Sequence, residues 1–313
     1  MKKVIAIMMF VMVICTVTFG QPVVPPDTDF EVTQNRDGRT LTISRYKGSA
    51  KDISIPATLY GLPVTVIGKE AFKERSLTGV VIPEGVITIG ESAFRGADGY
   101  SSNSNRLLSV VIPNSVTTIG ESAFSNNRLT SVTIPNSVTT IGARAFSNNL
   151  LASVTIPNSV TTIGARAFSY NQLTSVTIPS SITTIEETVF YENRLTSVII
   201  PDSVTTIKRN AFRNNRLTSV IIPDSVTRIE SSDYANDGAF ADNPLTSLTL
   251  GKGLVFIGRD SFKGNPLTSI TIAKDERTID TRAGFEQSFI NFYVSQNRSL
   301  GTYVKNGPIW SKE

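Results

Sequence analysis

Two aspartates supply the pair of carboxylates that glycoside hydrolysis requires. Asp202 and Asp224 occupy the same place in two similar segments of the chain, and stacking of those segments would set them about 5 Å apart. Retaining glycosidases hold their two carboxyl groups at about this separation. The same place in other segments is occupied by Asn114, Asn136, Asn158 and Ser180. Aspartate commonly replaces asparagine in turns, so the pair is interpreted as turn chemistry rather than a catalytic site.

A second polar segment, residues 233–238, partly resembles a calcium-binding loop. It reads Asp-Tyr-Ala-Asn-Asp-Gly, but Ala235 offers no side-chain oxygen and Pro244 stands where a closing glutamate belongs. A polar surface loop is therefore the favoured interpretation. The sequence predicts neither a metal site nor a cofactor.

Other catalytic chemistry is restricted by composition. The chain contains no histidine, and its single cysteine is Cys15 near the N-terminus. Beyond that segment the chain therefore lacks the atoms for Ser-His-Asp triads, cysteine nucleophiles, His/Cys zinc sites and structural disulfides. We predict that the protein is not an enzyme. A carbohydrate-active enzyme that uses carboxylates alone is the alternative from another class.

A repeat of 22 residues organises most of the chain. Its clearest copies are residues 129–150 (LTSVTIPNSVTTIGARAFSNNL) and 151–172 (LASVTIPNSVTTIGARAFSYNQ). A unit this short cannot close its own core, so it must stack on its neighbours as a solenoid. The Ile-Pro pairs that mark the period are 112–113, 134–135, 156–157, 178–179, 200–201 and 222–223. The matching aromatic residues are Phe124, Phe146, Phe168, Phe190 and Phe212.

Residue types predict the structure within one unit. Leu129, Val132 and Ile134 follow the pattern of a short strand, and the proline at 135 ends it. A second short extended piece spans 138–141, and a helical or 3₁₀ turn is expected at 145–146. Stacked asparagines should satisfy backbone groups of adjacent turns. These asparagines are Asn127, Asn149, Asn171, Asn193 and Asn215. The fold class is therefore a right-handed, β-rich α/β solenoid with short parallel strands.

The unit LTSVTIPNSVTTIGARAFSNN resembles the leucine-rich repeat of BspA-type bacterial surface proteins. The resemblance covers about residues 41–279, and the ending from Gly301 to Trp310 is similar to C-terminal segments of spirochaete members. It implies a leucine-rich repeat solenoid that is exported or surface-displayed and takes part in adhesion to host matrix proteins or cells. No catalytic residues define the family, and no outer-membrane sorting domain or wall-anchor motif is visible in this chain.

Residues 1–20 are predicted to be a signal peptide. Lys2 and Lys3 precede an apolar run over 4–17, and residues 18–20 (Thr-Phe-Gly) offer a cleavage site. The run is shorter than the roughly 20 residues of a bilayer span, so no stable membrane span is expected in the mature chain. Lipidation at Cys15 and an uncleaved anchor are the alternatives. The predicted location is secreted or at the cell surface, with the periplasm as an alternative.

The net charge gives no nucleic-acid signature. The formal net charge is +4, and loss of Lys2 and Lys3 with the signal peptide lowers it to +2. Such a balanced surface creates no large field that attracts phosphates.

The chain is predicted to contain further segments before and after the repeat. Residues 21–29 are proline-rich and are predicted to be a flexible lead-in. Residues 30–54 are predicted to form an N-terminal cap, 55–281 the solenoid and 282–313 a C-terminal capping segment rich in aromatic residues. Insertions at 95–106 and 230–239 interrupt the period.

Candidate ligand-binding residues lie at the outward position of the first strand. This position is Thr133, Thr155 and Thr177 in three units, but Ile199 and Ile221 in the next two. An exposed apolar pair is typical of a contact surface. Arg194 and Arg216 stand directly before the leucines that begin the same two units and could meet an acidic partner. An ordinary solvated surface is the alternative interpretation for both sets.

These observations together predict an exported, non-enzymatic solenoid that binds a protein. The expected partner is a host extracellular matrix or cell-surface protein, and the expected state is a monomer. A periplasmic scaffold without host contact is the main alternative.

Overall fold

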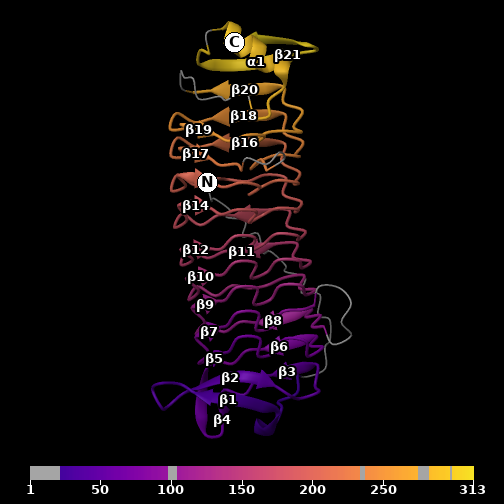
Figure 1. The fold of residues 1–313 in the computed structure, drawn as a ribbon, viewed down its shortest axis with the longest axis vertical. Coiled ribbons are helices and arrows are strands. Elements are labelled where there is room, and N and C mark those ends of the chain that lie inside the picture. The colour runs from indigo at the N-terminus through magenta and orange to yellow at the C-terminus, as the bar shows by residue number, and fades with distance from the viewer. Residues whose placement is uncertain (1–21, 98–103, 233–236, 274–281, 297) are drawn as a thin grey trace, which may run out of the picture.

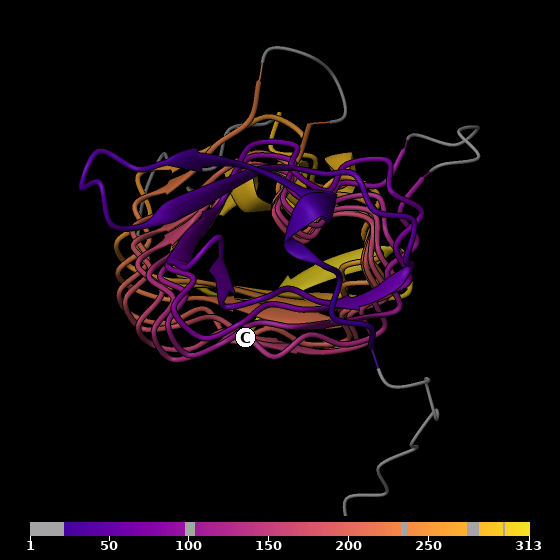
Figure 2. The ribbon, with the colours of Figure 1, turned by 90° about the horizontal axis from the view of Figure 1, so that it is seen from below.

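The computed structural model describes residues 22–97, 104–232, 237–273, 282–296 and 298–313. The chain forms an elongated stack of turns, with its N-terminal strands at one end and its C-terminal helix at the other (Figure 1). Seen along the stack, the turns superimpose as closed loops around a shared interior (Figure 2). The predicted signal peptide, Cys15 and residues 233–236 of the calcium-like segment lie outside the described residues.

One strand ladder is built from the Thr-Ile pair of each turn. Residues one repeat apart pair in parallel, as Thr140 with Thr162 and Ile141 with Ile163. The ladder runs in two stretches within the described residues. The first contains β5 (Leu62–Ile67), β7 (Thr88–Ile89), β9 (Thr118–Ile119), β10 (Thr140–Ile141) and β12 (Thr162–Ile163). The second contains β14 (Thr184–Ile185), β15 (Thr206–Ile207), β17 (Arg228–Ile229) and β19 (Phe256–Ile257).

A second ladder forms from the L-x-x-V-x-I segment of the turns, and we call this side the strand face. Its pairing is also parallel, as Ile221 with Thr249. It runs in three stretches among the described residues. They are β3 (Asp52–Ser54), β6 (Gly79–Val81) and β8 (Ser109–Val111); β11 (Val154–Thr155) and β13 (Val176–Thr177); and β16 (Ser219–Ile222), β18 (Ser247–Leu250) and β20 (Ser269–Ile272).

The N-terminal end of the stack is closed by an antiparallel pair, β1 (Phe30–Gln34) and β2 (Leu41–Tyr46). β2 also pairs in parallel with β5, so this hairpin is continuous with the first ladder. A short strand, β4 (Thr58–Leu59), pairs antiparallel with β5.

Residues 22–29 differ from the flexible lead-in that their proline content suggested. Val23 donates its N–H to the carbonyl of Asp52 at 3.0 Å and accepts from the N–H of Ser54 at 2.8 Å. Residues 27–29 then form a 3₁₀ turn, η1 (Asp27–Asp29). Because prolines restrict the chain without preventing edge pairing, this segment docks beside β3.

The C-terminal end carries α1 (Gln287–Ser295), β21 (Gly301–Asn306) and β22 (Ile309–Lys312). β21 extends the ladder of β20 in the antiparallel direction, and β22 pairs with β21. Gly307 and Pro308 form the hairpin loop, and Gly307 has φ +61°. Phe289 contacts both Tyr303 and Trp310 edge-on, so the aromatic residues of this segment pack over the last turn. No helix among the described residues has the length and apolar character needed to cross a bilayer.

The third side of each turn, which we call the turn side, carries the Ala-Phe pair. Ala145 and Ser147 donate to the carbonyls three residues earlier, which are those of Gly142 and Arg144. Arg144 has φ +55°, a left-handed conformation that stops these 3₁₀-type bonds from continuing as a helix. Of the helical or 3₁₀ turn expected from the sequence, the structure has the 3₁₀ type, as a pair of tight turns.

Columns of identical side chains fill the interior. In most units the leucine, valine and isoleucine of the L-x-x-V-x-I segment are buried, and the phenylalanine rings stack along the axis, with 5.4 Å between the centroids of Phe124 and Phe146. The asparagine column behaves as predicted. Asn149 accepts from the N–H of Leu129 at 3.0 Å and donates to the carbonyls of Phe124 and Phe146 at 3.0 and 3.1 Å. These amides join consecutive turns where no strand pairing exists.

Candidate functional site

The outward positions of the strand face project into solvent, as the alternation predicted. Thr133, Thr155 and Thr177 are exposed. Ile199 is 83% exposed and Ile221 is 67% exposed, although both are β-branched apolar side chains. Threonine at the same position in neighbouring turns offers a hydroxyl to water, whereas isoleucine offers only apolar surface. The two isoleucines are more exposed than Val111, which is 54% exposed at the same place of an earlier turn, and they are therefore the positions of this column that most favour contact with another molecule.

The strand ladder is discontinuous between these two residues. Ile199 bridges backward to Thr177, whereas Ile221 pairs forward with Thr249. Ile199 and Ile221 consequently belong to separate stretches of the ladder, on adjacent turns. The apolar pair lies at the boundary where these stretches meet.

Arg194 and Arg216 are exposed at the corner that leads into the strand face. Their backbone N–H groups donate to Leu173 and Leu195 of the preceding turns, each at 2.9 Å. Neither side chain has a carboxylate within salt-bridge distance among the residues the structure describes. Each arginine lies five residues before one of the exposed isoleucines, so charge and apolar surface occur together on the same two turns.

The aspartate pair shows no arrangement for catalysis. Asp202 and Asp224 are both exposed at the turn after the strand. The carboxylate of Asp224 accepts from the backbone N–H of Lys252 at 2.8 Å and lies 3.7 Å from its ammonium nitrogen. An exposed carboxylate in such a turn has no enclosed space in which a sugar could be distorted or protonated. The geometry supports the interpretation of both aspartates as turn residues.

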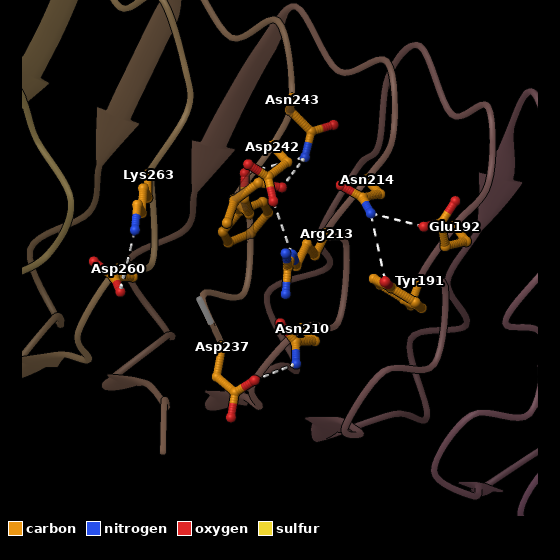
Figure 3. Close-up of polar contacts among 12 residues, drawn as sticks. Tyr191, Glu192, Asn210, Arg213, Asn214, Asp237, Asp242, Asn243, Asp260 and Lys263 are labelled. Carbon is orange, nitrogen blue, oxygen red and sulfur yellow. Dashed lines mark hydrogen bonds and ion pairs between the residues drawn. The ribbon is translucent and has the colours of Figure 1, made fainter. Parts of the chain in front are cut away.

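Asp237, the described carboxylate of the calcium-like segment, is engaged by protein groups (Figure 3). It accepts from Asn210 at 3.1 Å and from Ser232, and it lies 3.4 Å from the guanidinium of Arg209. Burial raises the pKa of Asp237, but the hydrogen bonds from Ser232 and Asn210 and the charge of Arg209 outweigh it and lower the pKa overall. In the described part of the chain no group of three potential metal ligands occurs.

A polar network on the turn side was not anticipated from the sequence. Arg213 donates to Asp242 at 2.9 Å, and its guanidinium lies 6.0 Å from the centre of the Tyr191 ring. Asn214 donates to Glu192 at 2.8 Å and lies 3.4 Å from the Tyr191 hydroxyl (Figure 3). This network borders a groove of about 380 Å³ whose lining includes Arg144, Arg166, Tyr170 and Tyr191.

The sequence did carry a signal for this groove. Tyr170 stands where the preceding unit has Asn148, and Tyr191 stands where the preceding unit has Ser169. Other units have asparagine, glutamate, serine or arginine at these two places. An exposed aromatic residue in an otherwise polar column indicates a contact.

A larger cavity of about 580 Å³ lies between the last turn and the C-terminal segment. Its lining includes Phe289 and Trp310, which contact each other, and Glu286 and Lys305, which form an ion pair. The charged pair of this cavity is thus already satisfied within the segment that closes the stack. The charged groups of this cavity are therefore less available to a ligand than those of the groove on the turn side.

Comparison with known proteins agrees with this architecture. The model of the BspA type leucine rich repeat region matches residues 100–218 and 205–304, in six copies. A leucine-rich repeat protein of T. pallidum is 26% identical over 61% of this chain and 89% of that chain, with a TM-score of 0.52. One from Bacteroides ovatus shares the fold at 22% identity, over 78% of this chain and 75% of that chain, with a TM-score of 0.50.

No curated protein matches the chain. Leucine-rich repeat proteins generally act as protein-interaction scaffolds, and BspA-like members are typically secreted or surface-located. The structure repeats a strand, a turn and a buried asparagine in each unit. The family model matches most of the chain and describes the same kind of repeat. The chain therefore belongs to the BspA type leucine-rich repeat family.

Proposed function

We propose that this protein is exported and displayed at the bacterial surface, where its strand face binds a host matrix or cell-surface protein. The observation that carries the proposal is the exposure of Ile199 and Ile221, at 83% and 67%, on a column in which they are flanked by Thr177 and Thr249. Burial of an apolar side chain of this size stabilises a complex by about 1.5–3 kcal/mol. The neighbouring Arg194 and Arg216 supply charge at the edge of the same patch.

Two further features support this function. The N-terminal residues 1–20 have the charge and apolar pattern of an export signal. The long, regular surface of a solenoid offers many contact positions in register with one another, which suits recognition of a protein. A non-enzymatic role agrees with the missing histidine and with the exposed turn position of Asp202 and Asp224.

Binding to host components tests the proposal directly. The protein from residue 21 onward is applied to a panel of immobilised extracellular matrix proteins and to host cells. Saturable binding to at least one of them is expected, and the Ile199→Thr/Ile221→Thr variant should bind at least about tenfold more weakly. Val255→Thr is the matched control, because Val255 is 61% exposed but lies outside the strand face.

Protease treatment of intact cells tests the location separately. A surface-displayed solenoid should be cleaved under conditions in which a periplasmic marker survives. Protection of this protein together with the marker would instead support the periplasmic scaffold, and absence of saturable binding to every component of the panel would count against adhesion.

A further inference from the structure

The groove on the turn side is distinct from the strand face and uses different residues of the repeat. It crosses the turns that contain Arg144, Arg166, Thr188 and Asn210, which occupy one column. Thr188 is short and 7% exposed, so it creates a hollow where the two preceding turns present long arginine side chains. Its φ of +59° is the left-handed conformation that Arg144, Arg166 and Asn210 share at the same place, so the turns of this column have one backbone conformation and differ in their side chains.

The other wall of the groove is aromatic. Tyr170 and Tyr191 meet edge to face with 5.2 Å between ring centroids and an interplanar angle of 87°. Tyr170 is 51% exposed, so one ring remains available for a ligand. Arg213 contacts the ring of Tyr191 through a cation–π interaction at 6.0 Å. The pair therefore presents a fixed apolar surface beside charged groups.

The charges that line the groove have one sign. Three arginines, Arg144, Arg166 and Arg213, line it, and no carboxylate does. Glu121 and Glu187 approach Arg144 and Arg166 only to 3.8 and 3.7 Å, and those two arginines are 49% and 42% exposed. Since Arg144 and Arg166 occupy the same place on consecutive turns, their backbones lie about 4.8 Å apart, and both long side chains can reach one anionic group between them.

A buried acceptor also faces this region. Asn210 donates through Nδ2 to the carboxylate of Asp237, which fixes the orientation of the amide because a carboxylate only accepts. Its Oδ1 is buried without a hydrogen-bond partner among the described residues. A buried oxygen in this state is unfavourable unless a donor reaches it. This oxygen is closed to solvent in the free protein, so a small shift of the side chains around it would let a ligand hydroxyl supply that donor.

The backbone beneath the groove is already paired. Arg166 donates its N–H to the carbonyl of Glu187, and Tyr170 donates to that of Tyr191, both at 2.9 Å. An extended peptide therefore cannot add to the groove as a further strand. Recognition must use side chains: guanidinium groups for an anion, a phenol ring for an apolar face and an amide oxygen for a hydroxyl. A sugar ring that bears an acidic group combines all three.

We propose that the groove lined by Arg144, Arg166, Tyr170, Tyr191, Asn210 and Arg213 binds an acidic saccharide, a sugar that carries a carboxylate or a sulfate. The anionic group lies between Arg144 and Arg166, the ring packs on Tyr170, and a hydroxyl donates to Oδ1 of Asn210. This site is independent of the protein-binding role of Ile199 and Ile221.

Calorimetry with three oligosaccharides tests the proposal on the chain from residue 21 onward. The probes are a heparin-derived hexasaccharide with sulfates and carboxylates, a hyaluronan hexasaccharide with carboxylates alone, and neutral maltohexaose. Binding of an acidic hexasaccharide without binding of maltohexaose is expected. Binding of both acidic probes identifies the carboxylate as sufficient, and binding of the heparin-derived probe alone identifies the sulfate. Absence of binding by both, or tighter binding of a glutamate-rich hexapeptide, would overturn the proposal.

Variants locate the binding. Arg144→Gln/Arg166→Gln should weaken it at least about tenfold, since charge-assisted hydrogen bonds are lost. Tyr191→Ser, which restores the residue found at Ser169, should also weaken it. Arg194→Gln/Arg216→Gln removes the same charge elsewhere and should change it little; an equal effect would show nonspecific attraction and overturn the site. Ile199→Thr/Ile221→Thr should keep full saccharide affinity, which separates this test from that of the proposed function.

Discussion

The ring centroids of Phe168 and Phe190 lie 6.0 Å apart, the widest step in the column of stacked phenylalanines from Phe72 to Phe285. The Thr-Ile ladder is interrupted at the same step, between β12 and β14. The step coincides with a change in a glycine column. A Cβ atom at Gly164 would lie 2.4 Å from the backbone nitrogen of Ala143, and the next turn has Glu186 in this place. The later turns carry Lys208 and Glu230 there and keep a continuous ladder, so the widening is confined to the step at which glycine first gives way to a side chain.

The glycine column gives a first prediction. Gly164→Ala should lower the free energy of unfolding by about 1–3 kcal/mol, because the added methyl group overlaps backbone that cannot move freely. Urea denaturation measures the change. Glu186→Ala is the matched control, since that turn already accommodates a Cβ atom; it loses only a partly exposed ion pair with Lys208 and should cost no more than about 1 kcal/mol. Equal losses in both variants would refute the close approach.

The asparagine column gives a second prediction. Asn149→Ala leaves the buried N–H of Leu129 without its acceptor, while the carbonyl of Phe124 keeps the donor Asn127 at 3.1 Å. The free energy of unfolding should fall by about 1–3 kcal/mol, which is the cost of one buried unsatisfied group. Asn136→Asp, at an exposed turn position that is aspartate in other units, should change stability by less than about 0.5 kcal/mol. Thermal or urea unfolding in parallel distinguishes the two.

The strand face gives a third prediction, which concerns stability rather than binding. Ile199→Thr/Ile221→Thr should leave the free energy of unfolding within about 1 kcal/mol of the parent, because both side chains are exposed in the free protein. Retention on a phenyl column should decrease at the same time. A large loss of stability would mean that these side chains pack within the molecule and are not available to a partner.

Asp237 gives a pH-dependent prediction. Its pKa in the folded protein lies below the ordinary value of 3.8, so its contribution to stability is complete above that value and is lost as the pH falls through the lowered pKa. Asp237→Asn should therefore destabilise the protein near pH 6, and the difference from the parent should shrink towards about pH 2. Urea unfolding at both pH values provides the measurement. A difference that grows on acidification would contradict the assigned direction.

The sequence predicted most of the repeating structure because each feature has one physical solution. Residues such as Val132 and Ile134 alternate with polar ones, Pro135 cannot donate to a ladder, and an asparagine recurs where backbone groups need partners. The burial of these columns and the exposure of Thr133 and Ile199 followed as expected. The helical turn at Ala145 was less well predicted, since a left-handed Arg144 is not visible in residue type.

The groove on the turn side could not be predicted from the sequence, because it depends on how the turns stack. Tyr170 and Tyr191 are not at equivalent positions of their units, and only the stacking of turns brings their rings edge to face. The link between Asn210 and Asp237 likewise depends on how the second insertion returns to the stack.

The sequence by itself determined the solenoid, its buried columns and its outward strand positions, because a period of 22 residues forces identical side chains into register. Only the tertiary structure decided where the strand ladder is interrupted, at the turn that contains Glu186. It also decided which side chains of neighbouring turns share one surface. The reason is geometric, because the spacing between turns and the direction of side chains depend on contacts between units. The residues of a single unit do not determine those contacts.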